Sequence, residues 1–385
     1  MAIDNKDKKI LNVPPLRFPE FTEEWKAEQL DNIATLSKGI GISKEQLSED
    51  GEPCILYGEL YTKYKSEIIK QVESKTDING SKLKRSKAND VIIPCSGETA
   101  VDIATARCVP FDNILFGGGL NVISLHQYDG AFMSYQLNGK RKYDIARVAQ
   151  GVSIVHLYGE HLKAIKTYNP TLPEQQKIAK LLSLLDDRID TQNKIIEDLK
   201  KLKSAISERL FKSVKGFTVL LSDLCDIVKG KQINGENLSD SGNYYVMNGG
   251  TEPSGYYDNY NVEASTISIS EGGNSCGYVQ FNTSPFWSGG HCYSIQNIAD
   301  KVDNMYLYHY LKSNEDAIMK LRIGSGLPNI QKKDLAMFKI IVPKIEWQIK
   351  ISTFLSSLER KAEIEERIQN VMQKQKLYLL QQMFI

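Results

Sequence analysis

The sequence repeats itself, which restricts the chain to folds that use one unit twice. Residues 30–58 align with residues 221–249 at a constant offset of 191. Further along the chain the offset becomes 171 and then 173. Self-similarity in one order over this length indicates a duplicated structural unit. The alignment pairs Lys38 with Lys229, Ile55 with Val246, Phe116 with Trp287, Pro170 with Pro343, Gln175 with Gln348 and Phe211 with Phe384.

The first part of each copy predicts a domain that mixes strands with loops and short helices. It is rich in Gly, Tyr, Asn and Ser and contains short β-branched runs such as 91–93 and 266–269. Turn sequences such as Glu49-Asp50-Gly51 and Ser241-Gly242-Asn243 separate these runs. Short strands bounded by turn residues are typical of a loop-rich sheet domain. We therefore predict the α+β class.

The second part of each copy predicts a long helix. Apolar residues follow Pro173 mostly at alternating intervals of four and three, and a similar run follows Pro343. This spacing gives a coiled-coil seam, and each helix has its counterpart as the available partner. We expect an antiparallel pair, with helices of about 38 residues that are about 57 Å long. The predicted divisions are an N-terminal arm (1–24), a first domain (25–172), a central helix (173–216), a second domain (217–343) and a C-terminal helix (344–385).

The first copy has 20 more residues than the second between Gly58 and Phe116. At the start of this stretch the tyrosines Tyr57, Tyr61 and Tyr64 interleave with Lys63 and Lys65, and the basic residues Lys82, Lys84 and Arg85 follow. Cations beside aromatic rings suit a surface that contacts phosphates and bases. A solvated surface insertion explains the same charges equally well.

Several kinds of chemistry are absent from the sequence. It has no Walker A motif, no GxGxxG fingerprint and no CxxC pair among its six cysteines. No apolar run reaches 18 residues, and the polar first nine residues do not form a signal peptide. The formal net charge is +1, so the chain as a whole is not a basic nucleic-acid coat. We expect a cytoplasmic binding protein without a metal, a membrane segment or a catalytic site.

Some polar residues have functional and structural explanations that the sequence leaves open. Asn248 and Thr251 lie in a glycine-flanked loop, where they suit either a base edge or a turn. Asn329 suits DNA contact or a hairpin cap. Glu98 and Glu271 follow short strands at places that the alignment makes equivalent. Each copy offers only one of these carboxylates, and we expect neither to have a second acid or a histidine beside it. A base-reading or structural role is therefore favoured over acid–base catalysis.

The whole chain resembles the specificity subunit of type I restriction–modification enzymes. Residues 16–25 look like the common N-terminal signature of that family, and residues 173–186 are similar to its central spacer helix. Residues 248–256, 270–275 and 287–291 resemble a common target-recognition domain. One departure is that Pro343 is followed by Lys-Ile-Glu-Trp-Gln, whereas the family pattern Pro-x-x-x-Glu-Gln is present in the first copy.

The resemblance implies two pseudo-symmetric α/β target-recognition domains separated by two long antiparallel coiled-coil spacer helices. Each domain would read one half of a bipartite, asymmetric site in double-stranded DNA. The helices would set the gap and dock two modification subunits, which carry S-adenosylmethionine and methylate adenine at N6. Restriction subunits would add ATP- and Mg-dependent cleavage, and this chain would bind no cofactor of its own.

Candidate DNA contacts follow from the charge, the loops and the resemblance together. Lys38 and Lys229 precede glycines at equivalent places, which suits phosphate contacts that position each domain. The alternative function is a duplicated carbohydrate- or peptide-binding scaffold, which leaves the two long helices unexplained. The candidate residues are Lys38, Tyr57, Lys63, Tyr64, Lys65, Lys82, Lys84, Arg85, Lys229, Asn248, Thr251, Tyr256, Asn274 and Asn329.

Overall fold

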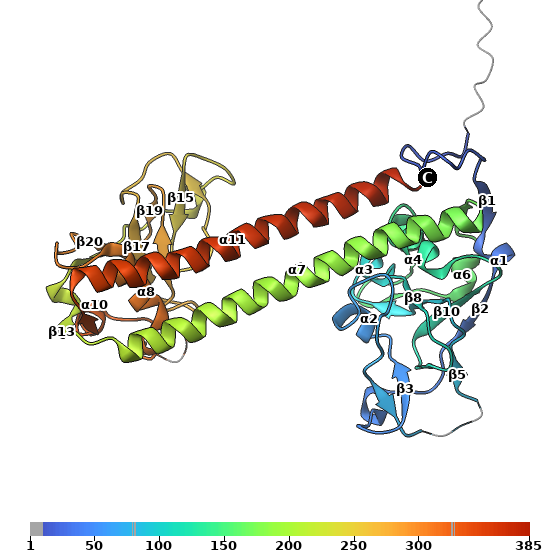
Figure 1. Cartoon of the computed structure of the whole chain (residues 1–385), viewed down its shortest axis with the longest axis horizontal. Coiled ribbons are helices and arrows are strands. Elements are labelled where there is room, and N and C mark those ends of the chain that lie inside the picture. The colour runs from blue at the N-terminus through green and yellow to red at the C-terminus, as the bar shows by residue number, and fades with distance from the viewer. Residues whose placement is uncertain (1–10, 79, 81, 325, 327) are drawn as a thin grey trace, which may run out of the picture. The chain divides into compact units, whose positions relative to one another are not determined.

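Both long helices are present in the computed structural model, as α7 (Leu172–Ser213) and α11 (Ile345–Gln382) (Figure 1). The structure describes residues 11–78, 80, 82–324, 326 and 328–385, so the polar first nine residues of the sequence lie outside it. The described chain forms two compact units that divide each long helix. The first unit comprises the chain up to Asn193 together with Ile368–Ile385, and the second comprises Lys194–Arg367.

The strands and short helices of the first unit, which we call the first domain, run from β1 to β12. Its main sheet is antiparallel, in the order β2-β10-β6-β8, and a smaller sheet has the order β4-β3-β9-β5. The elements are β1 (Lys26–Gln29), α1 (Leu30–Ile33), β2 (Ala34–Lys38), η1 (Lys44–Gln46), β3 (Glu52–Ile55), α2 (Glu59–Thr62), β4 (Lys75–Thr76), β5 (Lys84–Arg85), β6 (Asp90–Pro94), β7 (Ser96–Gly97), α3 (Ala100–Ile103), β8 (Arg107–Val109), β9 (Leu115–Phe116), β10 (Leu120–Leu125), α4 (Gly130–Asn138), α5 (Lys142–Val148), β11 (Val155–His156), α6 (Gly159–Lys163) and β12 (Lys166–Asn169).

The second domain, β13 to β21, has the same plan. Its main sheet has the order β14-β20-β17-β18, and its smaller sheet has the order β16-β15-β19. The elements are β13 (Phe217–Leu220), η2 (Leu221–Asp223), β14 (Asp226–Lys229), η3 (Gly235–Asn237), β15 (Tyr244–Met247), β16 (Tyr256–Tyr257), β17 (Thr266–Ser270), β18 (Val279–Asn282), β19 (Trp287–Ser288), β20 (Cys292–Gln296), α8 (Asn304–Ser313), α9 (Glu315–Met319), α10 (Lys332–Ala336) and β21 (Lys339–Val342).

Strand pairing confirms the repeat and corrects its register. Lys38 pairs with Asn121 in the first domain, and Lys229 pairs with Tyr293 in the second, so the offset on the second strand is 172. The pair Cys54–Leu115 likewise corresponds to Val246–Trp287. The alignment that placed Ile55 on Val246 and Phe116 on Trp287 is therefore one residue out. Turns differ in length between the copies, and a sequence comparison without strand partners cannot place such one-residue changes.

A second correction concerns the acidic residues. Glu271 donates its backbone N–H to His291, and in the first domain Cys95 makes the equivalent bond to Gly119. The equivalent of Glu271 is therefore Cys95, and Glu98 lies three residues beyond it. The prediction that Glu98 and Glu271 are equivalent is wrong.

Each domain is attached to the start of its helix by one buried glutamine. The Gln175 side chain accepts from the Asp129 N–H (2.9 Å) and donates to the Pro170 carbonyl (2.8 Å). Gln348 makes the same two bonds in the second unit, with Asp303 and Pro343, at 2.8 and 2.9 Å. The departure at the start of α11 therefore leaves the helix start unchanged, because the glutamine alone carries these bonds.

The end of each long helix completes the core of a domain within the same unit. In the first unit Phe384 packs against Phe132 (5.2 Å between ring centroids) and Trp25 (6.4 Å). In the second unit Phe211, which the repeat aligns with Phe384, packs against Tyr306 (5.8 Å). Each domain thus contacts the first part of the helix that follows it and the last part of the other long helix.

The described part of the N-terminal arm is held in place by contacts with the first turn of α7. Arg17 makes a two-pronged ion pair with the buried Glu174, at 2.7 and 2.8 Å. The Trp25 ring nitrogen donates to the same carboxylate at 3.3 Å. In the second unit the place of Glu174 is taken by Trp347, whose side chain is exposed. The family-like Glu-Gln pair therefore combines a docking residue for the arm with the buried glutamine.

A buried histidine makes the second unit sensitive to acid. His309 on α8 is 3% exposed, and its Nε2 forms a hydrogen bond with Ser356 Oγ at 2.9 Å. Burial lowers the pKa of His309 to about 4, although Glu359 and Asp303 act in the opposite direction. The unfolded chain, with a histidine pKa of about 6.5, binds more protons below that pH, so stability falls as the pH falls from 6.5 towards 4.

We expect His309 to cost the second unit about 2 kcal/mol at pH 5 relative to pH 7.5. Urea unfolding at both pH values measures this loss. His309→Gln should remove it, because glutamine keeps a hydrogen-bonding group and cannot gain the charge. His126→Gln, at an exposed position, is the control. A pH dependence that is the same in all three proteins would contradict the prediction.

Candidate nucleic-acid interface

Two equivalent lysines mark the ends of equivalent strands. Lys38 ends β2 and Lys229 ends β14, and both side chains are exposed. Each is followed by a glycine that another loop approaches closely. A Cβ on Gly39 would lie 2.1 Å from the Gly117 carbonyl oxygen, and one on Gly230 would lie 2.2 Å from that of Gly289. Only glycine allows this approach, which gathers several loops around each lysine.

In the first domain these loops carry mainly aromatic side chains, and we call them the first loop cluster: Lys38, Tyr57, Tyr61, Cys95 and Tyr158. The Lys38 ammonium lies 5.8 Å from the Tyr158 ring centroid, within reach of a cation–π interaction. Tyr61 donates its hydroxyl to the Ser96 carbonyl at 2.9 Å. Tyr57 and Tyr158 are 42% and 45% exposed, which suits rings on which a base can stack.

A tight hairpin lies beside the first loop cluster. Gln150 and His156 exchange two backbone hydrogen bonds, at 2.9 and 2.7 Å. Gly151 has φ +121°, and a Cβ there would lie 2.1 Å from the Ile154 carbonyl oxygen, so glycine is required. Val152 at the tip is 98% exposed and Ile154 is 61% exposed. The hairpin therefore presents apolar side chains to solvent at its tip.

In the second domain the equivalent loops carry polar side chains, and we call them the second loop cluster: Lys229, Asn248, Glu271, His291 and Asn329. Asn248 Oδ1 accepts from the His291 backbone N–H at 3.2 Å. Asn329 forms an antiparallel bridge with Gly272, directly after Glu271. The structure thus brings together three predicted residues, Lys229, Asn248 and Asn329. The two clusters share a backbone plan and differ in side-chain chemistry.

The predicted residues around α2 do not form one exposed basic surface. Tyr64 is 8% exposed and belongs to a hydrophobic core, so its predicted place at a DNA surface is wrong. Lys63 is bound to Glu59 (2.8 Å) and Ser74 (2.7 Å). Lys65 is exposed and makes no ion pair with any residue that the structure describes.

The remaining basic candidates lie on and before β5. Arg85 pairs with Glu52 across the small sheet, with 2.9 Å between Nη2 and Oε1. Lys84 is half-buried opposite Phe116. Lys82 is exposed and has no ion-pair partner within the described ranges. Among the predicted basic contacts of this region, Lys65 and Lys82 are therefore the best placed to receive a phosphate.

The other candidates of the second domain are spread over two places. Thr251 and Asn274 are exposed in loops that adjoin the second loop cluster through Gly249 and Gly272. Tyr256 is half-buried in β16, where it pairs with Tyr245 in the smaller sheet. Tyr256 is therefore not part of the cluster.

The sequence pattern singled out Tyr61 among the interleaved tyrosines and lysines, but it did not single out Tyr158 or His291 as DNA contacts. A signal for Tyr158 and His291 was present, because each lies beside a glycine in the sequence. The signal becomes usable only with the strand partners, since it depends on which loops meet around Lys38 and Lys229.

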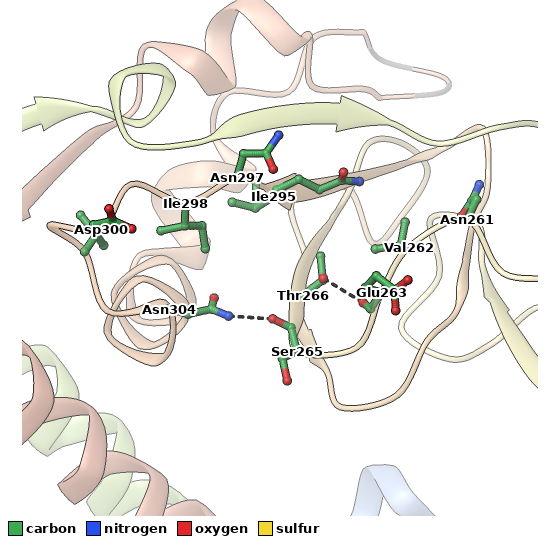
Figure 2. A pocket seen from close by; sticks show the side chains of 12 residues that line it. Asn261, Val262, Glu263, Ser265, Thr266, Ile295, Asn297, Ile298, Asp300 and Asn304 are labelled. Carbon is green, nitrogen blue, oxygen red and sulfur yellow. Dashed lines mark hydrogen bonds between the residues drawn. The ribbon is translucent and has the colours of Figure 1, made fainter.

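The residues that line a cavity in the second domain are drawn in Figure 2. They include Ile295 and Gln296, so the cavity lies at the end of β20 away from the second loop cluster. Its volume is about 460 Å³, and Asn304 closes one wall by donating to the Ser265 carbonyl at 2.6 Å. Its charged lining residues, Glu263 and Asp300, are acidic and disfavour a nucleic acid. Among the described residues no cluster of metal-ligating side chains is present. No helix in the described ranges is long and apolar enough to span a membrane.

Comparison with known families matches nearly the whole chain. The model of the type I restriction modification DNA specificity domain matches twice, at residues 22–201 and 216–374. The two matches correspond to the two copies of the repeat. They include both loop clusters and most of both long helices.

Individual relatives agree with this match. A putative type I specificity subunit of Mycoplasma genitalium is 34% identical over 122 residues, which is 31% of this chain and 31% of the relative. A type I restriction enzyme specificity subunit of Methanocaldococcus jannaschii is 24% identical over 420 residues, with 96% of this chain and 94% of the relative covered. A putative type I specificity subunit of Mycoplasma pneumoniae is 32% identical over 145 residues, which is 37% of this chain and 38% of the relative. The alignments to these two Mycoplasma relatives span about a third of their length.

Solved structures show the same fold. The crystal structure of a type I restriction–modification S subunit from M. genitalium matches with a TM-score of 0.68 at 20% identity, covering 97% of this chain and 99% of that one. A second structure, from work on assembly and conformational transition of the type I system, matches with a TM-score of 0.58 at 16% identity, covering 95% of this chain and 98% of that one.

Proposed function

This chain belongs to the family of type I restriction modification DNA specificity domain proteins, and from that premise we propose that each of its domains reads one half of a bipartite, asymmetric DNA site. The observation that carries the proposal is the pair of loop clusters. They lie at equivalent strand ends and present different side chains, aromatic in one and polar in the other. One backbone plan with two chemistries suits two different half-sites.

The proposal assigns no catalysis to this chain. Two modification subunits would dock on the long helices, supply S-adenosylmethionine and methylate adenine. Restriction subunits with ATP and Mg would complete the assembly. The helices would set the gap between half-sites, and the whole complex would act in the cytoplasm. The exposed apolar residues along both helices, such as Leu184 and Val371, support a role in docking partners.

Domain exchange tests this function. Residues 217–343 are replaced by the equivalent domain of another family member, and methylated motifs are read by sequencing the host genome with and without the chain. We expect one half of the motif to change and the other half to remain. The chain alone should methylate nothing. Methyl transfer by the isolated chain, or a change in both halves, would contradict the proposal.

The exposed lysines of the first domain should contribute phosphate contacts. We expect Lys65→Ala with Lys82→Ala to weaken DNA binding by the assembled methyltransferase. Each lost phosphate contact should also lower the slope of log K against log salt by about 0.9. Arg85→Ala is the matched control, because Arg85 is already engaged by Glu52. If the double variant keeps the wild-type slope, these lysines belong to ordinary solvated surface.

The scaffold alternative has less support. A carbohydrate- or peptide-binding module accounts for exposed tyrosines and asparagines, but it gives no role to two long helices that pack along both domains.

A further inference from the structure

Glu271 is an unusual residue in the second loop cluster. Its carboxylate is buried, and one of the two carboxylate oxygens makes no hydrogen bond with any described residue. The residue is 7% exposed. Oε1 accepts from Lys229 Nζ at 2.7 Å and from the Tyr293 hydroxyl at 3.0 Å. Oε2 has no hydrogen-bond partner among the described residues. His291 Nδ1 lies 3.9 Å from it, beyond hydrogen-bond distance.

The fold does not require a carboxylate here. Cys95 takes the same place in the first domain and makes the same backbone bonds. Its N–H donates to the Gly119 carbonyl at 2.7 Å and its carbonyl accepts from Leu157 at 2.9 Å, as against 2.9 and 2.8 Å for Glu271 with His291 and Ile330. A buried charge with an unsatisfied oxygen destabilises a domain, and a neutral side chain would avoid that penalty. The carboxylate is therefore better explained by a ligand than by folding.

The hydrogen-bonding groups of DNA restrict which part of it can be that ligand. A carboxylate repels phosphate oxygens and accepts hydrogen bonds from amino groups. In the major groove the amino donors are N6 of adenine and N4 of cytosine. Lys229, 54% exposed at its side chain, stands beside Glu271 and can hold the neighbouring phosphate or a base acceptor.

One exposed side chain, that of His291, lies close to Oε2. His291 is 61% exposed at its side chain and follows Gly289 and Gly290. A side-chain rotation of His291 would uncover the carboxylate without a change in the core. We propose that Glu271 is a specificity-determining residue of the second domain, and that it accepts a hydrogen bond from the exocyclic amino group of an adenine or cytosine. This inference rests on the proposed function.

The test pairs changes in the protein with changes in the DNA. The chain is assembled with its modification subunits, and binding to duplexes of its methylated motif is measured by fluorescence anisotropy. Amino groups are removed one at a time, with purine in place of adenine and 2-pyrimidinone in place of cytosine. The proteins are wild type, Glu271→Gln, Glu271→Cys (which installs the residue of the first domain), and the exposed control Glu236→Gln.

We expect one amino group in the second half-site to matter about 10- to 100-fold for wild type and for Glu236→Gln. The same deletion should cost both Glu271 variants little. The base whose deletion shows this difference identifies adenine or cytosine as the donor. The inference is overturned if every deletion costs the wild type and the Glu271 variants the same, or if the coupled base lies in the first half-site. A wild-type complex that prefers no motif would instead refute the proposed function.

Discussion

Inserting two residues into each long helix, after Asn193 in α7 and after Arg367 in α11, is expected to abolish sequence-specific methylation. Each helical residue adds a rotation of about 100°, so two residues turn one end of a helix by more than half a turn relative to the other. Under the proposed function both domains must face the same duplex. A rotation of this size removes one of them from it. Methylome sequencing of a host that carries the variant measures the loss.

A four-residue insertion at the same two points is the matched control. Four residues exceed one turn of 3.6 only slightly and add about 6 Å, compared with about 3.4 Å per base pair. We expect this variant to methylate both half-sites with the gap lengthened by one or two base pairs. Paired insertions are needed because the two helices are in contact, as between Asn193 and Gln369. An unchanged gap would show that helix length is not the ruler.

Lys376→Met should destabilise the first unit strongly. The Lys376 ammonium lies between two buried carboxylates, 2.6 Å from Glu67 and 2.7 Å from Asp186. Tyr135 also donates its hydroxyl to Asp186, at 2.7 Å. Removing the cation leaves two buried negative charges, which costs about 3–5 kcal/mol. For a unit of this size that lowers Tm by about 10 °C, measurable by calorimetry.

The equivalent pair in the second unit is the control. Lys203 binds Glu359 there, but the two side chains are 22% and 28% exposed, so Lys203→Met should cost about 1 kcal/mol. Burial already raises the pKa of Asp186, and Lys376 opposes that rise. In Lys376→Met the folded state therefore holds a proton to higher pH than the unfolded state does, so part of the loss should be recovered as the pH falls from 8 to 5. Equal losses in the two lysine variants, or no recovery in acid, would contradict the assignment.

The repeat and the helices were predictable because both depend on local pattern. The seam of α7 follows from the spacing of its apolar residues. Gln175 and Gln348 are identical residues at aligned positions of the two copies. The exact register of the sheets was not predictable. A difference of one residue in the turn before β15 makes Val246 equivalent to Cys54, whereas the sequence alignment had placed it on Ile55. Strand partners lie far apart in sequence, and only the folded chain specifies them.

The site was predicted less well than the fold, for a related reason. Lys38 and Lys229 were found because they stand beside repeated glycines. Tyr64 was misjudged because an alternation of tyrosine and lysine does not reveal which ring turns inward. Glu271 could not be weighed without its neighbours, because a carboxylate becomes informative only when one oxygen is seen to be bound and the other to have no partner.

The place of Phe384 has a consequence for how the chain is made. This ring packs on Trp25 and Phe132, residues synthesised about 360 and 250 positions earlier. The core of the first domain is therefore incomplete while the ribosome translates the second, and the C-terminal segment closes it after emerging from the exit tunnel. A nonsense mutation that removes Phe384 would leave apolar surface of the first domain, at Trp25 and Phe132, exposed.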